Sequence, residues 1–502
     1  MNKFKIFLIS AILLVAASCD KNFDVDYTYR ITGEQAAEKV EQDPSFLSSY
    51  VSGFYSYMIQ YNTQGSASTQ HDDFGFLSIT MISDFMGQDI AMNGTQNWGL
   101  YDYIHDYGQE NYSRPFMLWN FFYTWIGKAN EVIDFFQPDE EPSNATLKGY
   151  LGQAYAIRAM SYLYLMLYFQ DPVDASGALR TDAPAVPIIF ASRDSRSLEE
   201  TEAKGGRNTY ADIMEHIEEN LALALPLLNG YQRASKNEID YSVAQGIAAR
   251  YYLFTQQWAK AADAANKAYQ GYSLMNKERL YSGFMDCDDN EVLWGFNHTT
   301  ETMTAYASFF SMMSNECSGY SGIGQMIKCI SSELYGQIPA SDYRKGLFNS
   351  ASGDEGAPLV GGQYPYASRK FGYMAQWLQD YIFMRAAEMM LIEAEAYARL
   401  GQQTDAQSVL DVLMAQRDPA YSKTASVEEI LLQRRIELWG EGFEYFDLRR
   451  TGTGAVRVYE DSNHPQWARI DYPAHAKNWI FQIPLREIQN NMFISEDEQN
   501  EL

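Results

Sequence analysis

Residues 242–268 read SVAQGIAARYYLFTQQWAKAADAANKA and are the stretch that decides the fold. They predict a helix of small and aromatic residues, a short turn at Gln256 and Gln257, and a second helix with alanines three and four apart. Residues 384–414, MRAAEMMLIEAEAYARLGQQTDAQSVLDVLM, repeat this plan. Antiparallel helix pairs with Ala at the crossing are typical of tetratricopeptide-like repeats. The sequence therefore predicts a mainly α-helical protein built on helix pairs.

Two further pairs follow the same period more loosely. Residues 115–136 pair with 147–169, and 210–228 pair with 242–255, since apolar residues recur three and four apart in each. The two clear repeats are separated by an insert at about 277–378, which is rich in Gly, Ser, Met and aromatic residues. Its weak helical period predicts an irregular, loop-rich subdomain beside the helical scaffold.

Other segments give weaker signals. Residues 87–114 are dense in Gly, Asn, Asp and aromatic rings, which predicts a long loop, and long loops are often functional. Residues 456–459 and 479–483 are predicted as short strands, and 490–502 as an acidic tail.

The amino terminus has the pattern of an export signal. Residues 1–18, MNKFKIFLISAILLVAAS, combine a basic start with an apolar stretch too short to span a bilayer comfortably. Small residues directly before Cys19 resemble a lipobox, which implies a mature chain that starts at acylated Cys19 and continues through a tether at 19–31. No later stretch is apolar for long enough to cross a membrane. We therefore expect attachment to the membrane through the lipid alone.

Composition excludes some classes of function. The 502 residues include 38 Lys and Arg against 65 Asp and Glu, a net charge of −27, so a nucleic-acid partner is excluded for lack of clustered basic residues. Aromatic residues make up 15%, more than a core of this size usually needs, and part of them is expected at the surface. After Cys19, an odd number of cysteines remains: Cys287, Cys317 and Cys329. Buried thiols are the interpretation we favour, and their pairing stays open.

Four blocks of sequence give the chain a family resemblance. They are WNFFYTWIGKANEVID from 119, QAYAIRAMSYLYLMLYFQDPV from 153, RRIELWGEGFEYFDLRRTG from 434 and IPLREIQNN from 483. In this order, behind a lipobox, they resemble the SusD/RagB-type lipoproteins, the outer-surface nutrient-binding family of the Bacteroidota. The resemblance covers most of the chain and implies an N-terminal SusD-like region at 32–230 and a C-terminal SusD/RagB region at 231–502.

The resemblance also implies a function. It suggests a cell-surface, lipid-anchored outer membrane protein of polysaccharide utilisation, which binds glycan without catalysis and delivers oligosaccharide to a SusC-type TonB-dependent transporter. One alternative is a RagB-type member that captures peptides for the same kind of transporter. Two others are a surface glycoside hydrolase and a pure scaffold without a small ligand.

The sequence gives little support for a catalytic or metal site. Glu437 and Glu441 lie four apart on one predicted helix face, as a pair of acid/base carboxylates would. The neighbouring arginines, however, would keep both ionised, which favours a structural role over a general acid. No motif of a zinc protease or a phosphate-binding loop occurs. Asp286 and Asp288 offer oxygen ligands for a surface Ca²⁺, although the stretch is not an EF-hand, and no other cofactor is predicted.

Sugar binding needs an aromatic platform with a few polar groups around it. The predicted loop around residue 98 supplies this mixture, and the candidates are Asn93, Asn97, Trp98, Tyr101 and Tyr103. The resemblance implies that loops of the insert contribute as well, and the candidates there are Trp294, Phe296, Tyr306 and Tyr320.

Overall fold

The structure is a computed structural model that describes residues 39–502 except 41, 44, 65–69, 95–97 and 138–140. The predicted signal peptide, the lipid anchor at Cys19 and the tether lie outside the described residues. Helices dominate the described part, as the sequence predicts, and four short strands form two separate two-stranded sheets.

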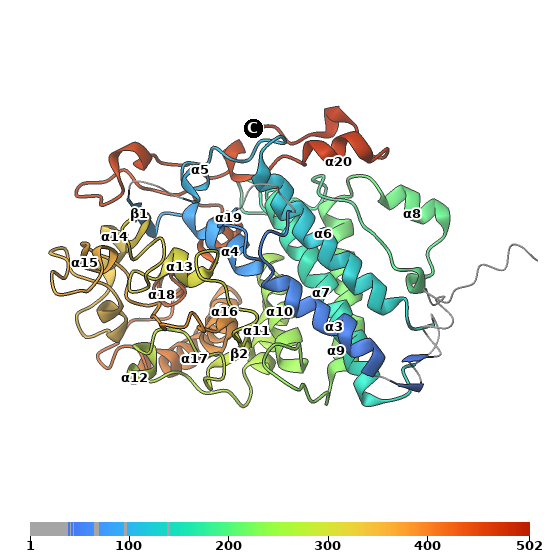
Figure 1. Cartoon of the computed structure of the whole chain (residues 1–502), viewed down its shortest axis with the longest axis horizontal. Coiled ribbons are helices and arrows are strands. Elements are labelled where there is room, and N and C mark those ends of the chain that lie inside the picture. The colour runs from blue at the N-terminus through green and yellow to red at the C-terminus, as the bar shows by residue number, and fades with distance from the viewer. Residues whose placement is uncertain (1–38, 41, 44, 65–69, 95–97, 138–140) are drawn as a thin grey trace, which may run out of the picture.

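The N-terminal half is a layer of long helices: α3 (Ser45–Met58), α6 (Ser113–Ile133), α7 (Ala145–Phe169) and α9 (Tyr210–Leu228) (Figure 1). Helix α7 packs between α6 and α9, and is therefore buried almost all round. The Asn144 side chain begins it by accepting the backbone N–H of Leu147 at 3.0 Å. Helix α9 packs more extensively against α7 than against α10, so the loose pairing predicted for 210–228 is not its main packing.

The two predicted repeats have the same local geometry. Helices α10 (Tyr241–Phe254) and α11 (Trp258–Ala268) form the first pair, and α16 (Ala386–Arg399) and α17 (Gln403–Ala415) form the second. Gln256 and Gly401 occupy the same left-handed turn position, with φ of 57° and 74°. The next residue of each turn donates its backbone N–H to the carbonyl oxygen five residues before it, at 2.9 Å in both. Helix α11 packs directly on α16, so the repeats are neighbours despite the insert between them.

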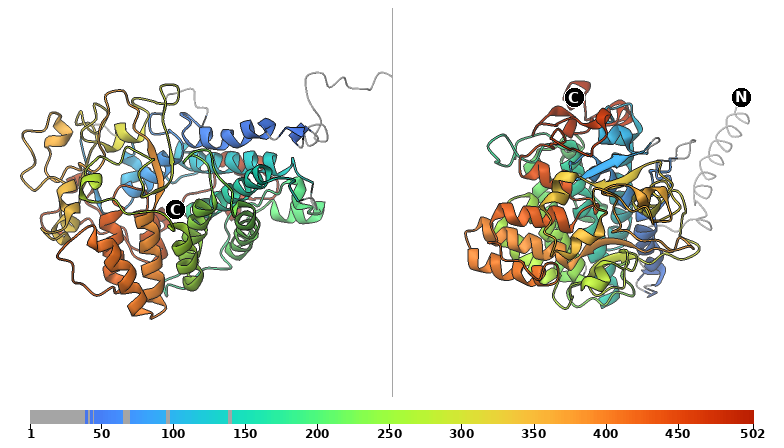
Figure 2. Two further views of the ribbon diagram at one scale, coloured as in Figure 1. Left: turned by 90° about the horizontal axis from the view of Figure 1, so that it is seen from below. Right: turned by 90° about the vertical axis from the view of Figure 1, so that its left-hand side faces the viewer.

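The insert is irregular, as predicted, and is held by short elements. They are α12 (Lys277–Leu280), β2 (Val292–Phe296), α13 (Phe309–Met313), β3 (Ile327–Ile330), α14 (Ser332–Gln337), η2 (Tyr343–Leu347) and α15 (Val360–Gln363). Strand β2 pairs antiparallel with β4 (Tyr381–Arg385), the strand that leads into α16. The β2–β4 pairing therefore attaches the insert to the helical scaffold. Figure 2 shows that α16 to α18 lie on the side of the molecule opposite α3.

The stretch at 87–114 is only partly the loop that the sequence predicts. It contains β1 (Ile90–Asn93) and α5 (Leu100–Tyr103), and it follows α4 (Phe76–Phe85). Strand β1 pairs antiparallel with β3 of the insert, with Ile90 opposite Ile330. Both elements have four residues, which is too short for a periodic signal in the sequence. This pairing holds the N-terminal loops beside the insert.

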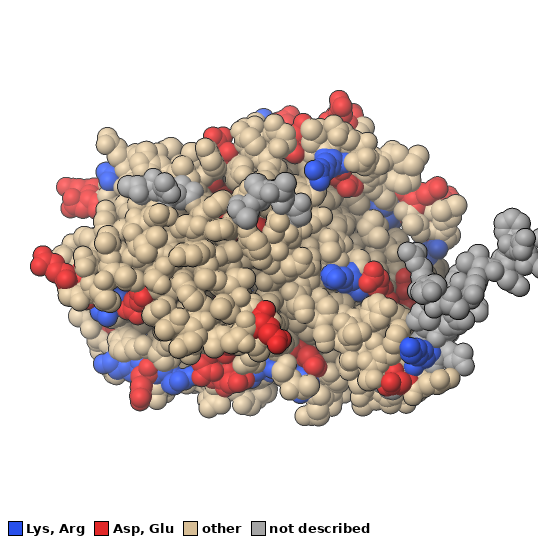
Figure 3. Space-filling view, in the orientation of Figure 1, with Lys and Arg blue, Asp and Glu red and all other residues tan. Residues whose placement is uncertain are grey.

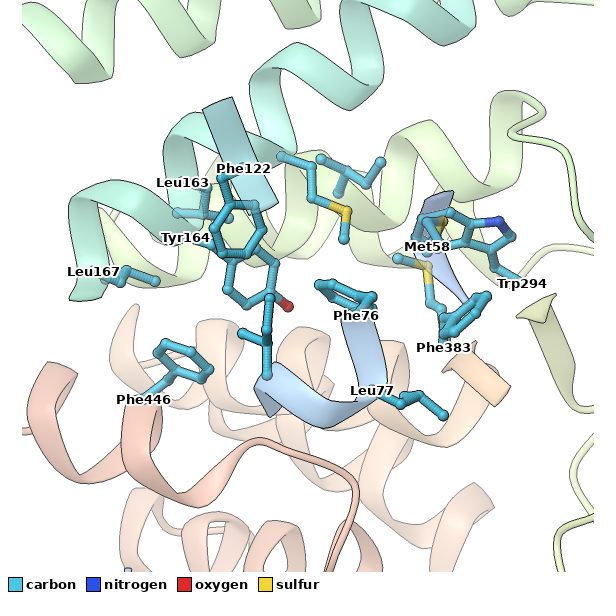
Figure 4. Packing of buried hydrophobic residues seen from close by; sticks show 14 of the residues in the cluster. Met58, Phe76, Leu77, Phe122, Leu163, Tyr164, Leu167, Trp294, Phe383 and Phe446 are labelled. Carbon is cyan, nitrogen blue, oxygen red and sulfur yellow. The ribbon is translucent and has the colours of Figure 1, made fainter. Parts of the chain in front are cut away.

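Aromatic rings fill the junction between the two halves (Figure 4). Phe122 of α6 stacks on Tyr164 of α7 with centroids 5.4 Å apart, and Phe76 of α4 lies 5.9 Å from Phe383 of β4. Trp294 of β2 meets Phe383 at 5.1 Å. Part of the many aromatic side chains therefore lies in the hydrophobic core.

The C-terminal part ties the two halves together. It contains α18 (Val427–Glu437), α19 (Glu444–Arg450) and α20 (Leu485–Asn490). The strands predicted at 456–459 and 479–483 do not form. The backbone N–H groups of Val456 and Arg457 donate to the side chains of Gln88 and Asp471. In the second segment, the N–H groups of residues 481 and 482 donate to carbonyl oxygens of α7 and of the loop at 108. The predicted acidic tail is docked on the molecule, and its Asn500 is buried.

Two results bear on the anchoring and the cysteines. Over the described residues, no helix combines the length and the apolarity needed to cross a membrane. Cys287, Cys317 and Cys329 are all buried and unpaired, in agreement with the favoured interpretation. Burial raises the pKa of each thiol.

Candidate functional site

Six aromatic side chains from separate loops form a connected surface that we call the ring platform. Its members are His71, Trp98, Tyr306, Tyr320, Tyr373 and Trp377. From Trp98 the ring contacts run to Tyr320 at 6.3 Å and to Tyr306 at a further 5.9 Å. They continue to Trp377 and then Tyr373, each step 6.3 Å between centroids. His71 stacks on Trp98 at 5.6 Å, so the chain of rings is continuous.

One end of the platform is fixed by a hydrogen bond between distant segments. His71 Nδ1 lies 2.6 Å from the hydroxyl oxygen of Tyr320, although the two residues are 249 positions apart. Tyr320 is held in turn through its backbone N–H, which donates to Ser311 Oγ at 3.2 Å. The pairing of β1 with β3 brings these two parts of the chain together.

A buried arginine holds the loops of His71 and Trp98 in place. Arg114 of α6 contacts Asp72 at 2.6 Å and binds both carboxylate oxygens of Asp102, at 2.7 and 2.8 Å. Asp72 follows His71 directly, and Asp102 lies four residues after Trp98. Because bidentate arginine contacts fix orientation as well as distance, this guanidinium positions both ring-bearing loops from beneath.

The other end of the platform is more exposed. The side chains of Tyr306 and Tyr373 are 52% and 39% exposed. Trp377 has a φ of 58°, in the left-handed region that a bulky side chain rarely adopts, and its backbone N–H donates to the Met374 carbonyl at 3.0 Å. Backbone strain of this kind is concentrated at functional positions.

The structure brings only some of the predicted residues together. Trp98, Tyr320 and Tyr306 are members of the ring platform. Tyr101 is 54% exposed, but its ring contacts Tyr107. Asn93 ends β1 half-buried, where its amide donates to the Asn463 carbonyl at 3.4 Å. Asn97 lies outside the described residues.

For three residues the prediction is wrong. Trp294 and Tyr103 are both 0% exposed, and Phe296 is buried as well. Trp294 donates its indole N–H to the Asn237 carbonyl at 2.8 Å, and Tyr103 stacks against His464 in the interior. A ring in the core has no face left for a surface ligand.

Sequence reasoning missed His71, Tyr373 and Trp377. His71 gives no signal, because one polar loop residue in the sequence does not show which ring it stacks on. The other two lie in GYMAQW, residues 372–377, a short ring-bearing stretch that follows the pattern of the loop around Trp98. That composition is the one signal that points to them.

The paired glutamates form a buried ionic network. Glu437 contacts Arg344, Arg385 and Arg417 at 3.1, 2.7 and 2.9 Å. Burial alone would raise the pKa of Glu437, but these three guanidinium groups outweigh it and hold that pKa well below its ordinary value. Arg385 and a buried lysine likewise lower the pKa of Glu441 against the effect of burial. Both carboxylates stay ionised, which is unsuitable for a general acid.

A pocket of about 300 Å³ lies elsewhere, between the end of α4 and the corner of α18 and α19. Two carboxylates join the two sides of the pocket through hydrogen bonds. Asp84 accepts the backbone N–H groups of Gly442 and Glu444 at 2.7 and 3.0 Å. Glu444 in return accepts those of Gln88 and Asp89 at 2.6 and 2.9 Å. None of the platform rings lines this pocket, and its polar groups are engaged in joining the chain segments.

The acidic turn that the sequence offers as a Ca²⁺ site pairs with an arginine. Asp286 and Asp289 bind the guanidinium of Arg279 at 3.0 and 2.5 Å, while Asp288 lies on the surface near Asn297. The described residues contain no cluster of three or more His, Cys, Asp or Glu side chains arranged to hold a metal ion. The structure gives no support to a cation at this turn.

Comparison with known proteins identifies relatives over most of the chain. A family model described as starch-binding and associating with the outer membrane matches residues 44–253, and the SusD family model matches residues 373–501. Among curated proteins, SusD-like protein P38 of Formosa agariphila is 31% identical over 112 residues. That match covers 20% of this chain and only 22% of the relative.

Solved structures show the same fold over nearly the whole chain. A SusD-like carbohydrate binding protein from Bacteroides vulgatus has a TM-score of 0.75 and 23% identity, and the match covers 91% of this chain and 98% of that one. Surface glycan-binding protein A from Bacteroides uniformis has a TM-score of 0.68 and 16% identity, over 91% and 99% of the two chains. Both family models, in the expected order, and the shared fold lead to one conclusion: the chain belongs to the SusD/RagB family.

Proposed function

We propose that this chain is a non-catalytic, cell-surface glycan-binding lipoprotein that captures oligosaccharide and passes it to a SusC-type TonB-dependent transporter. The observation that carries the proposal is the ring platform, six connected rings with exposed faces at Tyr306 and Tyr373. Aromatic faces provide the apolar contact that the C–H faces of sugars need, and neighbouring polar groups orient the hydroxyls.

The relatives support the same ligand class. One matching family model is described as starch-binding, and two proteins of the same fold are described as carbohydrate binding and glycan-binding. Anchoring through acylated Cys19 is part of the proposal. It would keep the platform at the cell surface, because acyl chains contribute about 0.8 kcal/mol of membrane affinity per buried CH₂.

The test is titration calorimetry of the purified protein against plant, host and microbial polysaccharides, with peptides in the same panel. We expect at least one glycan to bind, and Tyr306→Ala and Trp98→Ala each to weaken that binding at least about tenfold, because each removes a stacking face. The matched control is Tyr50→Ala. Tyr50 is an exposed tyrosine of α3 whose ring packs on Phe135, away from the platform.

Three results would count against the proposal. Binding of peptides alone would favour the peptide-capturing alternative. New reducing ends after incubation with polysaccharide would favour a hydrolase. Co-purification with a transporter from native membranes, together with no glycan affinity, would favour a scaffold.

A further inference from the structure

We infer that the ligand of the ring platform is a neutral polysaccharide, a chain of hexose or pentose units without carboxylate or sulfate groups. This inference rests on the proposed function and specifies the substrate class of the same site. It follows from the charges around the rings.

No basic residue accompanies the rings in the segments that carry them. The described residues 61–64, 70–73, 98–101, 299–308, 316–325 and 373–378 contain no Lys or Arg. The two undescribed stretches next to them read GSAST and TQN, which are also uncharged. In Figure 1 the loops around α5 and α13 face the viewer, and in Figure 3 the area over these loops is largely tan, with the basic side chains of that face lying to its sides and below it.

Three cations that contact these segments or follow them closely in the chain already have partners. Arg114 is buried between Asp72 and Asp102. Arg369 binds Glu316 and Asp354, at 3.2 and 3.5 Å. Lys328 is fully buried and donates to the Met326 carbonyl at 2.6 Å. Arg114 and Lys328 are therefore buried away from a ligand, and the charge of the half-exposed Arg369 is balanced by two carboxylates.

An acidic glycan would therefore meet only repulsion. Glu301 is exposed in the ring-bearing segments, and the whole chain carries a net charge of −27. Removing a carboxylate or sulfate from water without pairing it with a cation costs free energy. Tight binding of such a group would need an Arg or Lys beside it. The long-range field of the protein acts in the same direction.

The polar groups beside the rings suit hydroxyls. Gln325 and Gln376 carry amides in the ring-bearing segments, and Tyr306 carries an exposed phenol. Amides and phenols both donate and accept hydrogen bonds, as sugar hydroxyls do. Because five ring contacts follow one another along the platform, the arrangement is suited to a chain of sugars more than to a single unit.

The experiment compares pairs of glycans that differ only in charge. Polygalacturonate is paired with its carboxyl-reduced form, and a sulfated galactan with its desulfated form, beside a panel of neutral glycans, at low and moderate NaCl. We expect binding to be confined to neutral glycans, each acidic glycan to bind at least about tenfold more weakly than its neutral partner, and affinity for the neutral ligand to be insensitive to salt.

A charge introduced at the platform gives an independent measurement. Gln376→Lys is expected to raise the affinity for acidic relative to neutral glycans by about fivefold, the size of one exposed charge pair. If an acidic glycan binds more tightly than its neutral partner, and Tyr306→Ala removes that binding, the inference is overturned while glycan binding stands. If no glycan of either kind binds, the proposed function fails and the inference with it.

Discussion

At the scale of single residues, burial and charge decide what each carboxylate does. Glu437 lies among three guanidinium groups and stays ionised. Asp84 is equally buried, but its direct partners are the backbone N–H groups of Gly442 and Glu444. Its burial raises the pKa of Asp84 to about 7, against an ordinary value of 3.8.

The raised pKa of Asp84 predicts a pH dependence of stability. The folded protein keeps the Asp84 proton up to about pH 7, whereas the unfolded chain loses it near pH 4. The folded state therefore binds more protons between these values, and the contribution of Asp84 to the free energy of unfolding falls as pH rises. Relative to Asp84→Asn, which cannot titrate, the wild type should lose about 2 kcal/mol between pH 5 and pH 7.

Urea unfolding at several pH values measures this difference. The control is Asp106→Asn, which replaces an exposed carboxylate and should leave the difference from wild type nearly constant with pH. A flat profile for Asp84→Asn would show that Asp84 is already ionised in the folded protein.

The structure brings together only some of the site residues predicted from the sequence, for a physical reason. Trp98 and Tyr320 are predicted as site residues because they stand in loops of suitable composition, and the structure places both in the ring platform. Trp294 and Tyr103 have the same residue types in similar stretches, yet both are buried. Whether a ring faces solvent depends on which distant segment covers it, and His71 belongs to the platform only through a contact 249 positions away.

At the scale of elements, the long periodic helices were predictable and the short ones were not. The repeats that became α10–α11 and α16–α17 follow from their own apolar period. Strand β1 and helix α5 have four residues each, and they exist because β3 and Arg114 hold them. The turn between α18 and α19 also depends on a tertiary contact, since Gly442 approaches Thr80 of α4 closely.

Gly442 is predicted to be irreplaceable at that turn. Its φ is 90°, and a Cβ there would overlap the Thr80 side chain. Gly401 has a similar φ of 74°, but nothing lies within 4 Å of where its Cβ would be. Gly401→Ala should therefore cost only the left-handed strain of about 1–2 kcal/mol, while Gly442→Ala should cost about 1–3 kcal/mol more.

Thermal and urea unfolding of the two variants measure this comparison directly. Equal losses in both would show that Thr80 moves aside, and that backbone conformation alone accounts for the glycine.

At the scale of the whole molecule, the C-terminal segment is docked on the helical N-terminal half of the described residues. Asn500 donates its amide to the carbonyls of Phe169 and Phe481, both at 2.8 Å, and accepts from Arg207 at 2.9 Å. The sequence predicts an acidic tail at 490–502, and its composition alone does not show where such a tail lies. The Asn500 amide has three partners, the farthest of them 331 positions away, and these contacts place the tail on the molecule.

Asn500→Ala should lower the free energy of unfolding by about 1–3 kcal/mol, because it leaves buried polar groups without a partner. The control is Met492→Ala in the same segment, where the side chain is almost fully exposed and the change should stay within about 0.5 kcal/mol. Denaturant titration of both variants measures the difference. Equal stability of the two would mean that the Asn500 side chain contributes nothing to the docking of the tail.

The separation of the ring platform from the Arg–Glu network has a consequence for evolution. The rings stand on loops outside the long helices, while Glu437 and its arginines join the C-terminal elements. Under the proposed function, substitutions in the loops change the ligand without destabilising the fold, whereas substitutions in the network destabilise the fold whatever the ligand. Proteins that descend from one ancestor should therefore differ more in their ring platforms than in their Arg–Glu networks. Under the proposed function, a change of ligand should need only a few substitutions in the loops.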